Sequence, residues 1–411
     1  MEVMVARCAA LDVHKKQVTV CVRSPATDGG RREEVRTFGS VMGELESLAG
    51  WLHSEGVTQV VMESTGSYWK PVWAVLEDAG FDLLLVNARH VKQVPGRKTD
   101  VADAAWLAQL LEVGLLKGSF VPPPVIRQLR DLTRYQKRLI QDRAREANRV
   151  GKVLEDAAIK LGSVASDILG SSGRAMIEAL IAGERDPDRL AELAKGTLRN
   201  KIPDLIKALH GRFEEHHAVL LRMHLDHIDH LDAAIDVLDE RIDELIGPFA
   251  ETRELLSSIP GVAQRVANVI IAETGADMTR FPTAAHLASW AGLCPGNDES
   301  AGKRKTGKTR PGDVWLTDAL TQAAWSASRS NDNFLKLRYW RLARRIGKKK
   351  ALIAVAHQIL VIVWHMLTTR TPYQDLGDDW YQTQTNPQRR IDQLVRQLQA
   401  LGQDVTLTPA A

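Results

Sequence analysis

Four carboxylates in the first quarter of the chain are spaced so that the predicted elements would bring them to one point. Asp12 and Glu63 each end a short apolar run, as expected at the end of a buried strand. Asp100 and Asp103 stand three residues apart at the start of a helical stretch, so they share one helix face. Carboxylates gathered in this way repel one another unless a cation lies between them, and hard oxygen ligands suit Mg²⁺ or Mn²⁺. The pattern predicts metal-assisted phosphoryl transfer.

A second group of reactive residues lies in the segment 297–312, where a serine precedes a basic stretch rich in glycine. Glycines let the backbone approach a ligand closely, and the basic side chains supply positive charge for phosphates. Ser300 is the candidate nucleophile, and the hydroxyls of Thr306 and Thr309 remain alternatives because no histidine stands beside Ser300 in sequence. A flexible basic loop is the plainer interpretation. The expected phosphate contacts are Lys303, Arg304, Lys305, Lys308 and Arg310.

Two further segments are strongly basic. The stretch 127–152 holds nine Lys or Arg against three acids, and the stretch 334–350 interleaves basic residues with aromatic ones. One charge run is usually a solvated face, but three of them together with an acidic metal site indicate a long polyanion as the partner. The further nucleic-acid contacts that we expect are Arg134, Arg138, Lys348, Lys349 and Lys350.

The elements that must position the acids lie in residues 1 to about 115, which alternate strand and helix. Three strands, a helix and then strand–helix pairs are the order of a ribonuclease-H-like (RuvC-like) α/β domain. In that fold the first strand is central and its end holds the first metal carboxylate, which is Asp12 here. A proline run at 122–124 marks a domain boundary, and the sequence pattern beyond it predicts mostly helix.

The helical part contains a seam of apolar residues at 3-4 spacing within the acidic stretch 214–244. This seam predicts a long helix that pairs either inside the chain, as a helical hairpin, or with a second copy. Six histidines in 210–230 could hold a metal, but the acids around them favour a solvated face. The seam residues are Leu221, Leu225, Ile228, Leu231, Ile235, Leu238, Ile242 and Leu245.

The region after residue 250 begins with a Pro260-Gly261 turn between helical runs, similar to the helix-hairpin-helix that contacts the DNA backbone. Residues 351–367 are apolar but short and contain two histidines, which favours a buried helix over a membrane span. The predicted domains are a RuvC-like metal domain at 1–120, a helical coiled-coil and association region at 121–250, a mostly α-helical C-terminal domain with the helix-hairpin-helix-like segment and the candidate serine at 251–375, and a polar tail at 376–411.

The composition is that of an ordinary globular protein, with 411 residues, 44% hydrophobic residues, 26% charged residues and a net charge of +3. The three cysteines form no Cys-x-x-Cys pair, so they suggest neither a disulfide framework nor a structural zinc site, and they fit a reducing cytosol. No basic-then-apolar signal opens the chain. We therefore expect a cytoplasmic protein.

These motifs resemble the DEDD transposases of the insertion-sequence one-hundred-ten group, also called bridge-RNA-guided recombinases. The N-terminal fragments are Leu11-Asp12-Val13-His14-Lys15, Met62-Glu63-Ser64-Thr65-Gly66 and Lys98-Thr99-Asp100-Val101-Ala102-Asp103-Ala104. The C-terminal fragments are Ile259-Pro260-Gly261-Val262, Trp290-Ala291-Gly292-Leu293-Cys294-Pro295 and Ser300 with Gly302, Gly307 and Gly312. One departure is Ser300-Ala301-Gly302, where the family usually reads Ser-Gly.

The resemblance implies that Asp12, Glu63, Asp100 and Asp103 form a RuvC-like site for Mg²⁺ (or Mn²⁺) and that Ser300 is the nucleophile. It implies donor and target DNA, a noncoding bridge RNA, and a homo-oligomer, dimer or tetramer, in which the acidic domain of one subunit meets the serine domain of another. It also implies association with the prokaryotic nucleoid during activity.

Three alternative functions stay open. A RuvC-like structure-specific nuclease would use the serine loop only to grip DNA. An ATP-binding relative of sugar kinases and actin would need a glycine at the turn 12–15, which has none. A non-catalytic nucleic-acid scaffold would use the basic helices alone, with acids such as Asp100 serving as helix caps.

Overall fold

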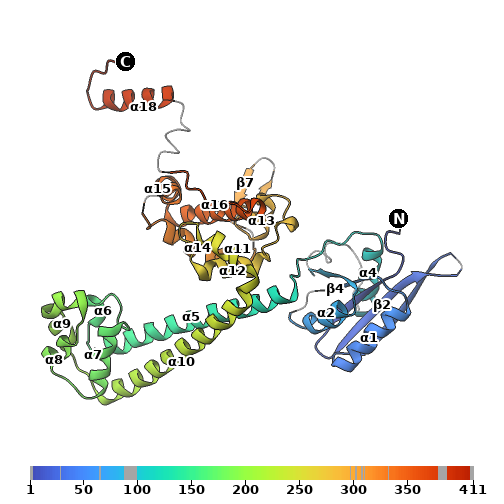
Figure 1. Ribbon diagram of the computed structural model, residues 1–411, viewed down its shortest axis with the longest axis horizontal. Coiled ribbons are helices and arrows are strands. Elements are labelled where there is room, and N and C mark those ends of the chain that lie inside the picture. The colour runs from blue at the N-terminus through green and yellow to red at the C-terminus, as the bar shows by residue number, and fades with distance from the viewer. Residues whose placement is uncertain are drawn as a thin grey trace. The chain divides into compact units, whose positions relative to one another are not determined.

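The structure is a computed structural model that describes residues 3–27, 29–63, 66–87, 100–296, 298–300, 303–306, 309, 311–331, 333–377 and 387–407. The chain divides into two compact units, Met1–Pro122 and Pro123–Ala411 (Figure 1). This division falls inside the proline run. The finer division of residues 121–411 into three domains stays a prediction.

The first unit is built on a five-stranded sheet with the order β3-β2-β1-β4-β5. β1 is central, pairing antiparallel with β2 and parallel with β4. The first strand is therefore central, as predicted, and the ribonuclease-H-like α/β fold class is confirmed. The strands are β1 (Cys8–Val13), β2 (Gln17–Pro25), β3 (Arg31–Gly39), β4 (Gln59–Glu63) and β5 (Asp82–Val86).

Helices cover both faces of this sheet, which explains why the central strands are almost continuously apolar. One face, including Leu11 and Met62, joins a core with the first two helices. The other face, including Ala10 and Val61, packs against α4. The helices that the structure describes in this unit are α1 (Met42–Ser54), α2 (Trp69–Asp78) and α4 (Asp100–Glu112).

The second unit contains a long antiparallel helical hairpin of α5 (Pro124–Asp156) and α10 (Glu215–Ile246), drawn in teal and yellow-green in Figure 1. The seam residues from Leu221 to Ile242 are largely buried within the chain, with Leu139 and Val150 of α5 in the same clusters. The internal hairpin is thus the role that the structure shows for the seam. Part of the opposite charge on the two helices is paired across it, as between Arg143 and Asp232.

A small helical module connects the far ends of α5 and α10 and has its own apolar core, which includes Leu161, Met176 and Leu205. Its elements are α6 (Leu161–Val164), α7 (Ser171–Ile181), α8 (Pro187–Glu192), the 3₁₀ helix η1 (Gly196–Lys201) and α9 (Ile202–Leu209).

The rest of the second unit forms a helical head around α16 (Lys348–Thr369). This helix is long and apolar enough to cross a membrane, but Val355, Ile359 and Leu360 are fully buried in the core of the head. It is the buried helix expected from the sequence. The other α-helices described in this region are α11 (Ala250–Ser257), α12 (Gln264–Thr274), α13 (Ala284–Trp290), α14 (Val314–Ala327) and α15 (Phe334–Ile346), and α18 (Pro387–Ala400) follows in the tail.

Candidate functional site

Asp12 and Glu63 occupy matching positions at the ends of two neighbouring parallel strands. Leu11 pairs with Met62 in the β1–β4 ladder, so Asp12 and Glu63 are the next residues along each strand. Adjacent strands lie about 4.8 Å apart. Since side chains alternate between faces and Leu11 and Met62 belong to the α1 and α2 side, the two acids belong to the face that α4 covers.

Helix α4 runs antiparallel to β1, which brings its first turn toward the Asp12 end of the strand. The thiol of Cys8, at the start of β1, donates to the carbonyl oxygen of Ala108 at 3.7 Å. From Cys8 to Asp12 the strand rises about 13 Å, and from Ala108 back to Asp100 the helix rises about 12 Å. The backbone therefore brings the turn that carries Asp100 and Asp103 level with Asp12.

The opposite end of α4 is held by a buried carboxylate. Glu112 accepts a hydrogen bond from Nε of Arg23 at 2.8 Å and forms an ion pair with Arg31. Its backbone oxygen also accepts from the N–H of Met4 at 2.9 Å. These contacts join the last turn of α4 to β2, β3 and the segment before β1, so they hold the helix in register along the sheet.

His14 is a neighbour of the acids that sequence reasoning did not select as a site residue. Its Nε2 lies 3.0 Å from Oδ2 of Asp12, whose side chain is 17% exposed. The available signal was the i, i+2 spacing, because such residues share one face of an extended chain.

The described side chains of these acids do not lie close enough to one another to form one set of metal ligands. Among the described side chains, Asp12, Glu63 and Asp103 do not form a group whose ligand atoms all lie within 4.8 Å of one another. The side chain of Asp100 lies outside the described residues. Strand register and helix direction therefore place only the backbone positions of these acids at one end of the sheet, and a shared site of the four acids stays a prediction.

One group of described side chains does meet that distance, far along the α5–α10 hairpin: Asp156, His216 and His217. His217 is buried, and its Nδ1 accepts the backbone N–H of Glu214 at 3.0 Å while its Nε2 lies 3.2 Å from Oδ2 of Asp156. Both ring nitrogens are thus engaged by protein groups, and the contact with Glu214 belongs to a capping box at the start of α10. A helix cap accounts for this cluster.

Ser300 lies at the end of a short hairpin strand. β6 (Asp298–Ser300) pairs antiparallel with β7 (Lys303–Thr306), and Ser300 is opposite Lys303 in the register. The backbone therefore sets the candidate nucleophile beside the hairpin turn. The side chains of Ser300, Lys303, Arg304, Lys305 and Thr306, and the whole of Lys308 and Arg310, lie outside the described residues.

The base of this hairpin is anchored between α13 and α14. Pro295 and Thr309 form a β-bridge below the two strands. A Cβ atom at Gly312 would lie 2.4 Å from the backbone carbon of Ala291, so only glycine permits this approach. Asp313 then caps α14 by accepting two backbone N–H groups. Each of these contacts restricts where the hairpin leaves the head.

The predicted helix-hairpin-helix corresponds to α11 and α12. At the turn, Gly261 has φ +87°, and a Cβ atom there would lie 2.2 Å from the carbonyl oxygen of Ala323 in α14. The turn is packed into the head through its glycine, while the first residues of α12 are exposed. Contact of this turn with DNA stays a prediction.

The predicted phosphate contacts differ in how far their charge is compensated. Arg134 donates two hydrogen bonds, of 2.8 and 2.7 Å, to the fully buried carboxylate of Glu273. Burial raises the pKa of Glu273, while the hydrogen bonds from Arg134 oppose that rise. Arg138 is exposed, and Lys348, Lys349 and Lys350 are exposed at the start of α16.

Comparison with known proteins links both halves of the chain to transposases. A family model described as "Transposase" matches residues 9–159, and one described as "Transposase IS116/IS110/IS902 family" matches residues 253–339. Together they cover more than half of the chain.

Three relatives match over most of their length. The y4pF/y4sB protein of Sinorhizobium fredii is 28% identical, over 74% of this chain and 71% of the relative. The 43.6 kDa protein of insertion element IS110 from Streptomyces coelicolor is 26% identical, over 78% and 84% respectively. The transposase for insertion sequence element IS1111A of Coxiella burnetii is 25% identical, over 77% and 79%. The structure of Thermus thermophilus RuvC aligns with 28% of this chain and 99% of its own, at 14% identity and a TM-score of 0.23.

Proposed function

This chain belongs to the IS116/IS110/IS902 family of insertion-sequence transposases, and from that premise we propose that it exchanges DNA strands through a covalent serine intermediate, guided by a noncoding bridge RNA. The observation that carries the proposal is the shared position of the acids. Asp12, the last residue but one of β1, and Glu63, the last residue of β4, belong to the face that α4 covers, and the first turn of α4 is level with Asp12.

The donor set fits a divalent cation. Asp12, Glu63, Asp100 and Asp103 offer carboxylate oxygens, the ligands that Mg²⁺ and Mn²⁺ prefer, and Asp12 and Glu63 are partly buried. A cation bound there would stabilise negative charge on the scissile phosphate and on the leaving oxygen. Without one, the like charges of the four carboxylates would oppose their approach.

In the proposed reaction, Oγ of Ser300 attacks the phosphorus of the scissile phosphodiester as its proton passes to a base. The new Oγ–P bond replaces the P–O bond to the leaving strand, whose oxygen takes up a proton and becomes a free hydroxyl. A hydroxyl of another strand can then attack the phosphoserine and release Ser300, so the number of phosphodiester bonds is conserved. Attack by water would only cut the strand.

The bridge RNA is the part of the proposal that rests on the family resemblance and on the three basic segments. The test is to sequence the nucleic acid that copurifies with the native protein. A discrete noncoding RNA is expected. Bulk DNA fragments alone would instead favour a structure-specific nuclease or a scaffold.

The serine step is tested by trapping a protein–DNA adduct on a denaturing gel, with duplex DNA that carries the element's end. We expect an adduct with the native protein and with Thr309→Ala, and none with Ser300→Ala. An adduct that persists in Ser300→Ala would contradict the assignment of the nucleophile. Cleavage without any adduct in the native protein would favour the nuclease.

A further inference from the structure

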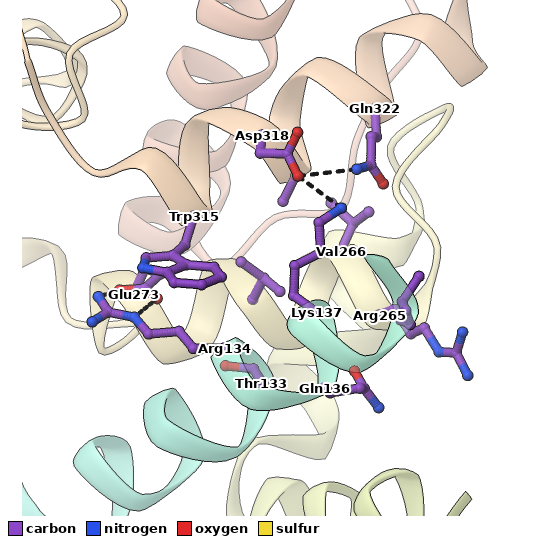
Figure 2. Close-up of a pocket in the computed structure, with 13 residues that line it drawn as sticks. Thr133, Arg134, Gln136, Lys137, Arg265, Val266, Glu273, Trp315, Asp318 and Gln322 are labelled. Atoms are coloured by element: carbon purple, nitrogen blue, oxygen red, sulfur yellow. Dashed lines mark hydrogen bonds and ion pairs between the residues drawn. The ribbon is translucent and has the colours of Figure 1, made fainter. Parts of the chain in front are cut away.

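A cavity of about 190 Å³ lies inside the second unit, where α5, α12 and α14 meet (Figure 2). Much of its wall is apolar. This apolar part is formed by Ile140, Val266, Val269 and Ala319, together with the indole of Trp315. Pockets for drug-sized ligands usually measure about 300–1,000 Å³. This cavity therefore has room for one planar ring system, single or fused, and not for a whole nucleotide or cofactor.

Trp315 is held both through its backbone and through contacts to its ring. Its backbone N–H donates to the capping carboxylate of Asp313 at 2.9 Å, which fixes the start of α14. The guanidinium carbons of Arg134 and Arg138 each lie 5.6 Å from the indole centroid, within the range of a cation–π contact. Arg134 is itself held by Glu273, as Figure 2 shows, and Trp315 also lines the cavity, so the position of the indole in the cavity wall is fixed.

Polar groups are gathered at another part of the wall. Oδ2 of Asp318 accepts from Nζ of Lys137 at 2.7 Å and from Nε2 of Gln322 at 3.1 Å, and Figure 2 shows these three side chains apart from Arg134 and Glu273. Nε2 of Gln136 donates to Asp239 at 2.7 Å, which leaves its carbonyl oxygen to be an acceptor. Amide and carboxylate groups of this kind form hydrogen bonds with the edges of unstacked bases.

We propose that this cavity binds a single unpaired nucleobase, stacked on Trp315 with its hydrogen-bonding edge toward Asp318 and Gln322. The attached phosphates would find positive charge at Arg138, which has no carboxylate within ion-pair distance among the described residues, whereas Lys137 is paired with Asp318. An aromatic side chain of another protein would use the indole but not the charge of Arg138. The inference goes beyond the proposed function, since neither the four acids nor Ser300 takes part.

The test compares two short single strands of equal length. One consists of abasic sugar–phosphate units with one central adenine, and the other is abasic throughout. The native protein is expected to bind the adenine strand roughly tenfold more tightly, the size of one base–aromatic stack. Trp315→Ala should remove the difference. Trp325→Ala should keep it, because Trp325 lies on the same helix, carries Arg329 on its ring and does not line the cavity.

A second variant, Ala319→Met, fills the cavity and retains Trp315, and it should also remove the preference for adenine. If Trp315→Ala loses the circular dichroism spectrum of the native protein, the binding of the two strands by Ala319→Met tests the proposal instead. Equal binding of both strands by the native protein, or an equal loss in Trp325→Ala, would overturn the proposal. So would equal binding of a strand with phenyl in place of adenine, which would indicate a site for an aromatic side chain. Ribose and deoxyribose versions of the strand distinguish RNA from DNA as the source of the base.

Discussion

Arg134 and Glu273, which are 139 residues apart in the chain, form a two-bond ion pair that joins the long helix α5 to α12 of the head. Nε of Arg130 also lies 3.1 Å from the same carboxylate. The carboxylate is fully buried, so its removal would leave two partly buried guanidinium groups without their anion.

We expect Glu273→Ala to lower the free energy of unfolding by about 3–5 kcal/mol, as for the loss of one partner of a buried pair. Urea denaturation of the whole chain measures it. Glu244→Ala removes the exposed partner of Arg241 and is the control, with a much smaller loss expected. Equal losses in the two variants would mean that the buried pair does not stabilise the junction.

Asp12→Asn should abolish DNA cleavage while retaining nucleic-acid affinity, because it removes a charged ligand oxygen at little cost in shape. Cleavage and filter binding are measured on the same preparation, across a titration with Mg²⁺. Asp78→Asn changes an exposed acid of the same unit and should leave both unchanged. Normal turnover by Asp12→Asn would refute its role in a metal site.

Removal of charge from the serine hairpin should weaken DNA binding and flatten its salt dependence. In the triple variant Lys303→Gln, Arg304→Gln and Lys305→Gln, the slope of log K against log salt should fall by roughly 0.9 for each lost phosphate contact. The control replaces Lys160, Lys201 and Lys207 of the small helical module, which equalises the change in net charge. An unchanged slope in the hairpin variant would reject contact with phosphates.

The two cysteines of the sheet should be inert in the folded protein. Burial raises the pKa of Cys8 to about 11 and that of Cys21 to about 12, so both stay protonated at neutral pH. At pH 8 a thiol reagent should modify only Cys294, which is partly exposed, and should modify all three in denaturant. Rapid modification of Cys8 without unfolding would contradict the packing of α4 on the sheet.

The raised pKa values of these two thiols also make the folded protein less stable at alkaline pH. A thiol whose pKa is higher in the folded state holds its proton more tightly there, so its contribution is present below the ordinary thiol pKa. That contribution falls as the pH rises from about 9 to 11 for Cys8 and from about 9 to 12 for Cys21. Thermal unfolding of Cys21→Ala should lose stability less steeply than that of the native protein over this range.

Gly261→Ala tests whether the Pro-Gly turn is held by close packing. The change combines the cost of positive φ, about 1–2 kcal/mol, with a collision against the carbonyl oxygen of Ala323. Gly183→Ala has positive φ but nothing within 4 Å and isolates the first cost. The melting temperature should fall clearly further in Gly261→Ala. Equal shifts would show that the turn can move away from α14.

The sequence by itself determined the architecture of the first unit. Apolar runs bounded by turns specify the strands, and their order specifies a central first strand, because consecutive short elements have few ways to pair. The ends of those strands also identify Asp12 and Glu63. The register of the parallel β1–β4 pairing then places both acids on the same face of the sheet.

Only the tertiary structure decided what depends on partners distant in the chain. The seam from Leu221 to Ile242 could serve a hairpin or a second copy, and burial against α5 selects the hairpin. In the sequence Arg134 is one member of a basic run, and only the structure shows that it donates to the carboxylate of Glu273. The cavity beside Trp315 is assembled from three helices, with lining residues from Thr133 to Gln322, and no local pattern encodes it, because its shape is set by how those helices pack.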